Sequence, residues 1–248
     1  MRLLGHMVTR NEMARYLTST LPWLVEICAG DVAVYDDQST DGTEHYVTEL
    51  GLHYKRRPDA IASFADNEGD FRWAAWQAME RRLHPRAGDW ILTVDADELL
   101  LSTTAGADLH DVVLQLIDSI ADAEEAGQAT ITFKVAEVFQ FDDMGWPLVR
   151  TDGYWGGITA CRLAKWQVQG VFEPRKEGGG SLPSSWPRAL VPHEQLQLLH
   201  LGYARPEDRI TKHERYSHGT GHNRRHIESI FTRPELDYWV GMRPPLQL

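Results

Sequence analysis

Three groups of polar side chains in this sequence each follow directly after a short apolar stretch. The groups are Thr9-Arg10-Asn11-Glu12, Asp36-Asp37 and Asp95-Ala96-Asp97. Carboxylates that lie together repel one another unless a cation is placed among them. Oxygen ligands of this kind suit a divalent cation, and Mg²⁺ in particular is often bound together with phosphate groups. The residue types and their positions therefore predict a site for a divalent cation and a phosphate compound.

The elements that must position these groups form an alternating series. Strands are predicted over residues 3–8, 32–35, 52–56 and 90–94, and helices over residues 68–83 and 109–120, with a helical stretch from residue 11 that breaks near Pro22. Alternation of this kind predicts an α/β fold, in which helices cover both faces of a mostly parallel sheet. In such a sheet the ligand binds beyond the carboxyl ends of the strands, where all three polar groups would then lie.

The pattern changes after residue 129. Residues 130–139 and 159–163 are predicted to be strands separated by loops rich in Gly and Trp, and apolar strand-like sequence resumes at Leu190. No internal repeat or low-complexity tract divides the chain. We therefore expect one domain over residues 1–248, whose second half decorates the first.

The composition is ordinary for a soluble globular protein. Hydrophobic residues make up 42% and charged residues 25% of the 248 residues, which excludes a disordered chain and a collagen-like rod. The longest apolar runs are far shorter than the ~20 residues that a membrane span needs, so no span is expected. Two cysteines are too few for a disulfide framework, and together with the lack of an N-x-S/T acceptor they indicate reduced thiols and a cytoplasmic location.

The net charge of −11 counts against non-specific binding of nucleic acid, whose affinity comes mostly from cations that meet phosphates. The charge is uneven, however. Residues 201–248 hold eight Lys or Arg residues against six acidic ones. This mildly basic end of an acidic chain is suited to facing a phosphate locally.

Two long motifs and several shorter ones together resemble the family 2 glycosyltransferases of GT-A fold. The long motifs are Ala33-Val34-Tyr35-Asp36-Asp37-Gln38-Ser39-Thr40-Asp41-Gly42-Thr43 and Trp90-Ile91-Leu92-Thr93-Val94-Asp95-Ala96-Asp97-Glu98. The shorter ones are Asn11-Glu12, Arg72, and His200-Leu201-Gly202-Tyr203 with the downstream Lys212 and Tyr216. The resemblance covers roughly residues 3–101, and more loosely residues 190–216. The stretch from about 140 to 190 matches no motif of the family.

The resemblance implies a metal-dependent transfer of a sugar from a nucleotide-diphosphate-sugar donor to an acceptor hydroxyl, with inversion at the sugar carbon. Residues 1–101 would form the nucleotide-binding half, and residues 102–248 the half that binds the acceptor and completes the metal site. The donor would be a UDP-, GDP- or dTDP-sugar. The acceptor is left open between a glycan, a lipid precursor, a protein and a modified nucleobase.

Particular residues take roles by the same resemblance. The Asp95 and Asp97 pair would hold Mn²⁺ or Mg²⁺ against the two phosphates, with Asp97 favoured as the direct ligand and His200 completing the metal shell. The apolar run before His200 suits a strand that delivers its imidazole. The positions implied for donor binding are Arg10, Asn11, Glu12, Asp36, Asp37, Arg72, Asp95, Lys212 and Tyr216.

The chemistry of such a transfer makes two further demands. The leaving nucleoside diphosphate gains negative charge, which a metal ion and nearby cations stabilise, and Arg72, Lys212 and Arg215 are the nearest candidates. A carboxylate must also remove the acceptor proton, and a dry site would raise its pKa. Asp152 is the first candidate for this base, because it lies beside aromatic residues and glycines. Glu137, on a predicted strand bordering the site, is the second.

Two other functions compete with this hypothesis. A sugar-1-phosphate nucleotidylyltransferase uses a related sheet and Mg²⁺, but Thr9-Arg10-Asn11-Glu12 is not the Gly-rich basic loop expected after its first strand. A carbohydrate-binding protein that has lost catalysis is the other, and the intact Asp95 and Asp97 count against it. The sequence also lacks the G-x-x-x-x-G-K-S/T, G-x-G-x-x-G and G-x-S-x-G motifs of P-loop, dinucleotide-binding and serine-hydrolase proteins.

Overall fold

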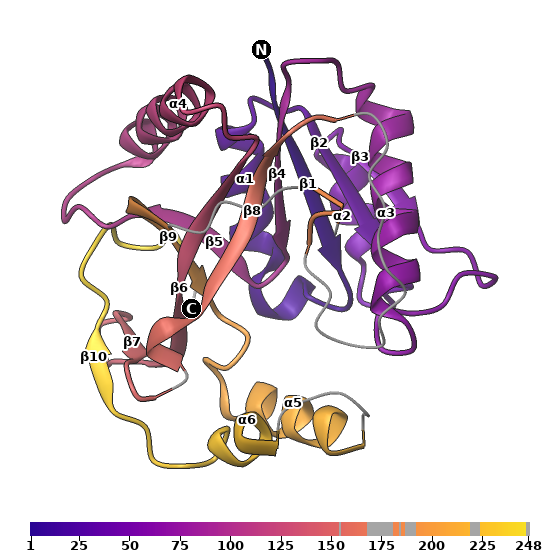
Figure 1. Ribbon diagram of the computed structural model, residues 1–248. Coiled ribbons are helices and arrows are strands. Elements are labelled where there is room, and N and C mark those ends of the chain that lie inside the picture. Colours follow the sequence, from indigo (N-terminus) through magenta and orange to yellow (C-terminus); the bar gives the residue numbers. More distant parts are fainter. Residues whose placement is uncertain (154, 168–180, 184, 187–191, 219–223, 247–248) are drawn as a thin grey trace.

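A computed structural model of the chain describes residues 1–153, 155–167, 181–183, 185–186, 192–218 and 224–246. A ten-stranded sheet runs through it, with the main order β10-β7-β6-β8-β4-β1-β2-β3, and β9 joins β5 to β6 (Figure 1). The predicted fold class, an α/β sheet flanked by helices, is confirmed: the central strands pair in parallel, and the second half of the chain adds mainly antiparallel pairs. In the described part of the chain no helix is both long and apolar enough to cross a bilayer.

Four parallel strands form the part of the sheet that the sequence predicts. They are β1 (Leu3–Thr9), β2 (Val32–Asp36), β3 (His53–Arg56) and β4 (Trp90–Asp95), and β1 pairs with both β2 and β4. Nearly every residue of β1, β2 and β4 is buried, as expected for strands covered on both faces. Each observed strand lies within one residue of its predicted bounds.

Helices cover the two faces of this sheet. They are α1 (Thr18–Ile27), α2 (Thr43–Glu49), α3 (Glu68–Leu83) and α4 (Leu109–Glu125). Alternate residues of β1 point to opposite faces, so Leu4 and Val8 pack with residues of α3 while Met7 packs with residues of α1 and α4. Figure 1 shows α3 and α4 on opposite sides of the sheet.

The helical stretch after β1 differs from the prediction. It begins as a π-helical turn, η1 (Met13–Leu17), and continues as α1, which runs through Pro22. Proline has no N–H and its ring crowds the carbonyl four residues earlier, which here belongs to Thr18, the first residue of α1. The irregularity therefore lies at the start of α1 rather than at Pro22, and π turns of this kind are frequent at functional sites.

The second half of the chain extends the sheet and adds a helical end. Its strands are β5 (Glu98–Ser102), β6 (Thr130–Phe141), β7 (Pro147–Arg150), β8 (Thr159–Lys165), β9 (Pro192–His200) and β10 (Leu236–Tyr238). Its helical segments are η2 (Trp155–Gly157), α5 (Pro206–His218) and α6 (Arg224–Ser229). Figure 1 shows α5 and α6 at the end of the molecule toward which β1, β2 and β4 run.

Strand β9 decides where His200 lies. It pairs antiparallel with β5 and parallel with β6, so that His200 is the register partner of both Glu98 and Glu137. Because Asp97 directly precedes Glu98, this pairing carries His200 to the predicted cation site. The strand that the apolar run before His200 predicts is thereby confirmed.

Candidate functional site

The three polar groups lie at one edge of the sheet. Thr9 is the register partner of Asp36, and Val8 is the partner of Asp95. The pairing continues past the strand ends, since the Asp37 N–H donates to the Thr9 carbonyl at 2.9 Å and the Ala96 N–H donates to the Val8 carbonyl at 3.1 Å. The common edge that the spacing predicts is therefore present in the fold.

Asp97 and His200 meet at this edge. Asp97 Oδ2 lies 3.2 Å from His200 Nε2, and the Leu201 N–H donates to the Asp97 carbonyl at 2.8 Å. Burial favours the neutral carboxyl, but His200 and Lys212 outweigh it and hold the pKa of Asp97 well below its usual range. The carboxylate is thus ionised and faces an imidazole nitrogen.

Glu137 holds the other side of the same imidazole. Its Oε2 lies 2.6 Å from His200 Nδ1, and its side chain is 6% exposed. Burial disfavours the charged imidazole, but the carboxylates of Glu137 and Asp97 outweigh it and raise the pKa of His200 well above its usual value. His200 is therefore fixed between two carboxylates, one on each ring nitrogen.

Lys212 brings a cation from α5 to the same place. Its Nζ lies 3.5 Å from Asp97 Oδ2 and 3.4 Å from His200 Nε2, and 4.3 Å from the centre of the Tyr203 ring. One helical turn earlier, Asp208 accepts a hydrogen bond from the Tyr16 hydroxyl at 2.7 Å. The helix that carries Lys212 is thereby tied to the η1 turn of the first half.

Glu12 lies beside this cluster at the start of the η1 turn. One carboxylate oxygen, Oε1, accepts from Arg15 at 2.7 Å, and the other, Oε2, is buried with no hydrogen-bond partner among the described residues. Burial first, and then the negative charge of Asp97, raises the pKa of Glu12 to about 8. Glu12 therefore keeps its proton at neutral pH when no cation is bound.

Asp95, predicted as a metal ligand, faces different partners from Asp97. Arg72 donates to its two oxygens at 2.9 and 3.2 Å, and Arg162 lies 3.7 Å away. Burial would raise the pKa of Asp95, but Arg72 and then Arg162 lower it. Two arginines thus neutralise this carboxylate.

Arg72, predicted as a contact of the donor, forms ion pairs with two carboxylates of the protein. Besides Asp95 it binds Glu68 at 3.0 Å, and its side chain is 5% exposed. A guanidinium already held by two carboxylates positions Asp95 and stiffens α3 against β4. Arg72 therefore lies at the predicted edge, with its guanidinium turned to carboxylates of the protein.

The nucleotide-binding positions predicted after β1 and β2 are joined to one another. Asp36 accepts from the Ser39 N–H at 3.0 Å and from the Tyr54 hydroxyl at 2.8 Å. Asp37 binds Arg10 at 3.3 Å and also Arg57.

Asn11 links the end of β1 to the loop after β2. The Asn11 N–H donates to Ser39 Oγ at 2.8 Å, and Asn11 Oδ1 accepts from the Thr40 N–H at 2.8 Å. These contacts fix the edge, and Arg10, more than half exposed, is its outward cation.

Asp152, the first candidate for the base, is held elsewhere. Arg150 binds both of its oxygens, at 2.9 and 2.6 Å, and these hydrogen bonds lower the pKa of Asp152. A base in a dry site would show the opposite shift, which counts against Asp152 as the base. Tyr216 packs in the cluster of Trp155, Tyr203 and Ile230, and the side chain of Arg215 lies outside the described part.

Comparisons with known proteins give distant similarity only to solved structures. No model of a protein family matches the chain, and no curated protein matches it. Staphylococcus aureus TarS is similar at 20% identity and a TM-score of 0.36, over 58% of this chain and 24% of that one. Glucosyl-3-phosphoglycerate synthase from Mycobacterium tuberculosis, solved with Mn²⁺, UDP and glucosyl-3-phosphoglycerate, is similar at 18% identity and a TM-score of 0.33, over 55% and 44%.

The chain thus spans less than half the length of each of these structures. A likeness to an enzyme that binds UDP and Mn²⁺ is present among solved structures. At these TM-scores it carries no argument about activity, and the function proposed below rests on the residues of the chain itself.

The donor set at Asp97 fits a divalent cation only as a partial shell. Within the described residues, no three His, Cys, Asp or Glu side chains are grouped as a metal site. Asp97 Oδ2 and His200 Nε2, however, are 3.2 Å apart, and neighbouring ligands of an octahedral ion with bonds of about 2.1 Å lie about 3 Å apart. Mg²⁺ is usually held by one or two carboxylates together with water and phosphate oxygens, and Asp97 supplies one such carboxylate.

Arg57 and Arg162 were not named as site residues from the sequence, and Gly202 was named only within the motif His200-Leu201-Gly202-Tyr203. Arg57 binds Asp37, Arg162 binds Glu98 and Asp95, and Gly202 lies under the cluster of Asp97, His200 and Lys212. Arg57 offered a signal, because it follows the third strand directly and so falls at the same sheet edge. Arg162 offered none, since its role depends on which strands pair.

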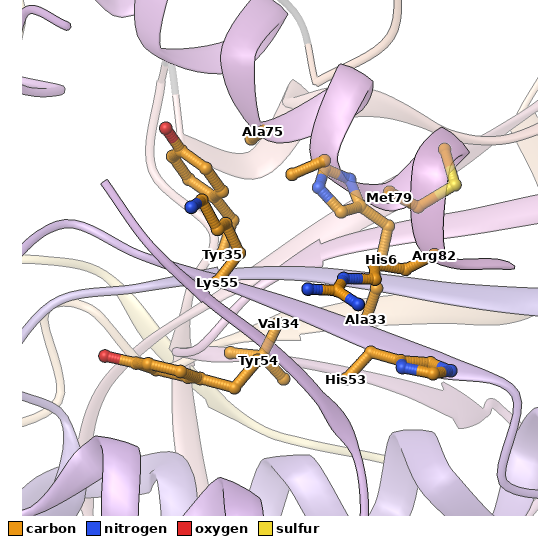
Figure 2. Close-up of a pocket in the computed structure, with 11 residues that line it drawn as sticks. His6, Ala33, Val34, Tyr35, His53, Tyr54, Lys55, Ala75, Met79 and Arg82 are labelled. Carbon is orange, nitrogen blue, oxygen red and sulfur yellow. The ribbon is translucent and has the colours of Figure 1, made fainter. Parts of the chain in front are cut away.

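A small cavity lies apart from this site, between β2, β3 and α3 (Figure 2). His6 points into it toward Ala75 and Met79 of α3. Burial lowers the pKa of His6 to about 3, so the ring is neutral. The cavity has room for about one water molecule and is therefore too small for a nucleotide or a sugar.

Proposed function

We propose that this protein transfers a sugar from a nucleotide-diphosphate-sugar to an acceptor hydroxyl, with inversion and with Mn²⁺ or Mg²⁺ as cofactor. The observation that carries the proposal is the meeting of Asp97 and His200 at the carboxyl edge of the parallel strands, with Lys212 beside them. Asp97 comes from residues 1–101, and the other two come from residues 102–248. We therefore propose that both halves act as one domain.

Asp97 Oδ2 and His200 Nε2 are the atoms that would hold the cation. When bound, the cation supplies positive charge to the leaving diphosphate without any proton transfer. The role of Glu137 in this proposal is to keep the imidazole oriented, because a carboxylate on Nδ1 leaves Nε2 as the nitrogen that faces Asp97. Glu137 is thus a positioning residue rather than the base.

The protein's own cations would share the charge of the diphosphate. Lys212 is placed beside Asp97, and Arg15, 28% exposed, lies between Glu12 and Asp208. The nucleoside would lie along the edge formed by Asp36, Asp37 and Asn11, where Arg10 is the exposed cation. Side chains that are already cross-linked by hydrogen bonds offer a preorganised surface, which lowers the entropic cost of binding.

Calorimetric titration tests the proposal. UDP-, GDP- and dTDP-glucose are titrated into the protein with Mn²⁺ and then with EDTA, and slow hydrolysis of each is followed by release of the nucleoside diphosphate. The proposal expects one nucleotide to bind in a Mn²⁺-dependent way and to be hydrolysed. Release of pyrophosphate from a nucleoside triphosphate and a sugar-1-phosphate would instead identify a nucleotidylyltransferase. Binding of sugars without any nucleotide would identify a carbohydrate-binding protein.

A further inference from the structure

The ammonium of Lys212 lies directly beside the two atoms that are proposed to hold the cation. Its Nζ is 3.5 Å from Asp97 Oδ2 and 3.4 Å from His200 Nε2. These are the two atoms to which the preceding section assigns the metal. Without a metal, the ammonium of Lys212 and the imidazole of His200 are therefore the two groups that face Asp97 Oδ2.

Gly202 makes this close meeting possible. A Cβ at this position would lie 2.5 Å from Asp97 Oδ2 and 2.7 Å from His200 Nε2, and still closer to Lys212 Nζ. Real Cβ atoms essentially never approach other atoms to within 3.0 Å. Gly202 does not have a positive φ angle, so the glycine supplies space rather than backbone freedom. The space over its Cα is filled by the three converging side-chain atoms.

The position of Lys212 is fixed by packing. Its side chain is 13% exposed, and its ammonium lies over the ring of Tyr203, an arrangement that attracts a cation to the ring face. Asp208, on the same face of α5 one turn earlier, binds Arg15 at 2.9 Å and Tyr16 at 2.7 Å. Asp208 thus anchors α5 to Arg15 and Tyr16. Lys212 is therefore held in place, unlike a surface lysine that samples many positions.

We propose that Lys212 is a resident cation of the site, which a divalent metal ion must displace from Asp97 before it can bind there. This inference rests on the proposed function, since it concerns the same metal. The displaced ammonium remains on α5 next to the metal, where it can meet the phosphate oxygens of the donor. Metal entry is thereby coupled to the position of α5.

The physical reason is competition of the ammonium and the metal for the same oxygen, Asp97 Oδ2. An ammonium that donates to Asp97 Oδ2 and a metal bonded to that oxygen are two positive charges at one acceptor, and like charges at such separation in a poorly solvated site repel strongly. Lys212 must therefore lower the affinity of the empty protein for metal. A diphosphate reverses this effect, because it supplies negative charge to both cations.

The test measures Mn²⁺ binding without nucleotide, by the loss of the electron paramagnetic resonance signal of free Mn²⁺. Lys212→Met removes the charge and keeps the length of the side chain, and we expect the affinity for Mn²⁺ to rise by about tenfold. Lys212→Arg keeps the charge and should not raise it. Lys165→Met is the matched control, because Lys165 pairs with Trp90 at the opposite end of β4 from Asp95 and binds the exposed Glu124.

Three further measurements complete the design. Adding Asp97→Asn to Lys212→Met must abolish the gain, which locates the metal at Asp97, and thermal melting shows that each variant is folded. UDP should bind Lys212→Met more weakly than the unchanged protein in the presence of Mn²⁺. The inference is overturned if folded Lys212→Met binds Mn²⁺ no more tightly than the unchanged protein. In that case, Mn²⁺-dependent UDP binding by the unchanged protein would still leave the proposed function standing. Failure of all variants to bind Mn²⁺, with or without UDP, overturns both.

Discussion

The carboxylate of Glu137 lies 2.6 Å from Nδ1 of His200, on neighbouring strands whose register pairs the two residues directly. A histidine that ligates a metal commonly gives its other ring nitrogen to a carboxylate, which fixes the orientation and the tautomer of the ring. The pair therefore has the form of a prepared ligand, with Nε2 directed at Asp97 before any ion binds.

Glu137→Gln should weaken Mn²⁺ binding by about 10- to 100-fold and leave the protein folded. Glutamine can still accept a hydrogen bond from Nδ1, but it removes the negative charge that makes the imidazole a better ligand. Titration of Mn²⁺ by calorimetry, together with a thermal melt, measures both quantities. An unchanged affinity in a folded variant would remove Glu137 from the site.

Asp97→Asn should abolish Mn²⁺ binding, with a loss of at least about 100-fold, because it deletes the charged ligand atom itself. Asp95→Asn is the contrasting variant, two residues away. Asp95 is paired with the buried Arg72. Loss of the Asp95 charge should therefore lower the free energy of unfolding, and breaking a buried pair costs about 3–5 kcal/mol. Equal Mn²⁺ affinities in the two variants would contradict the division of roles between them.

Gly202→Ala should separate the three atoms that meet over Gly202. The added Cβ would lie 2.5 Å from Asp97 Oδ2 and 2.7 Å from His200 Nε2, so both side chains must shift, and both Mn²⁺ binding and turnover should fall. Gly157→Ala, where a Cβ would meet nothing within 4 Å, is the control. Normal Mn²⁺ binding by Gly202→Ala would show that the cluster is looser than these distances require.

Glu12→Gln should change how stability depends on pH. The pKa of Glu12 rises from 4.5 to about 8 on folding, mainly through burial, so between these values the unfolded chain has lost a proton that the folded protein keeps. The free energy of unfolding must therefore fall as the pH rises from about 4.5 to about 8, and level off beyond that range. Urea denaturation in EDTA should show a shallower fall for Glu12→Gln. Identical slopes for the two proteins would place Glu12 outside the buried cluster.

Asp152→Asn tests whether the Arg150 pair is structural. Arg150 is 1% exposed, so loss of the charged partner should lower the free energy of unfolding by about 1.5–3 kcal/mol. Transfer at a temperature well below the melting point should stay close to that of the unchanged protein. A variant that binds donor normally but has lost transfer would instead restore Asp152 as the base.

The parallel strands of the central sheet could be predicted from local sequence. Apolar runs such as residues 32–35 and 90–94 predict buried strands, and parallel strands carry their carboxyl ends to one edge of a sheet. The side chains just after those strands, Asp37 and Asp97 among them, could therefore be assigned to one site without knowledge of the packing.

Only the tertiary structure decided which partner each carboxylate takes. Asp95 and Asp97 are two residues apart in the same motif, yet arginines of α3 and β8 bind the first while His200 and Lys212 face the second. His200 lies 103 residues after Asp97, and its place depends on the insertion of β9 between β5 and β6. Pairing over such a separation is set by strand register and burial, which the order of residue types along the chain does not contain.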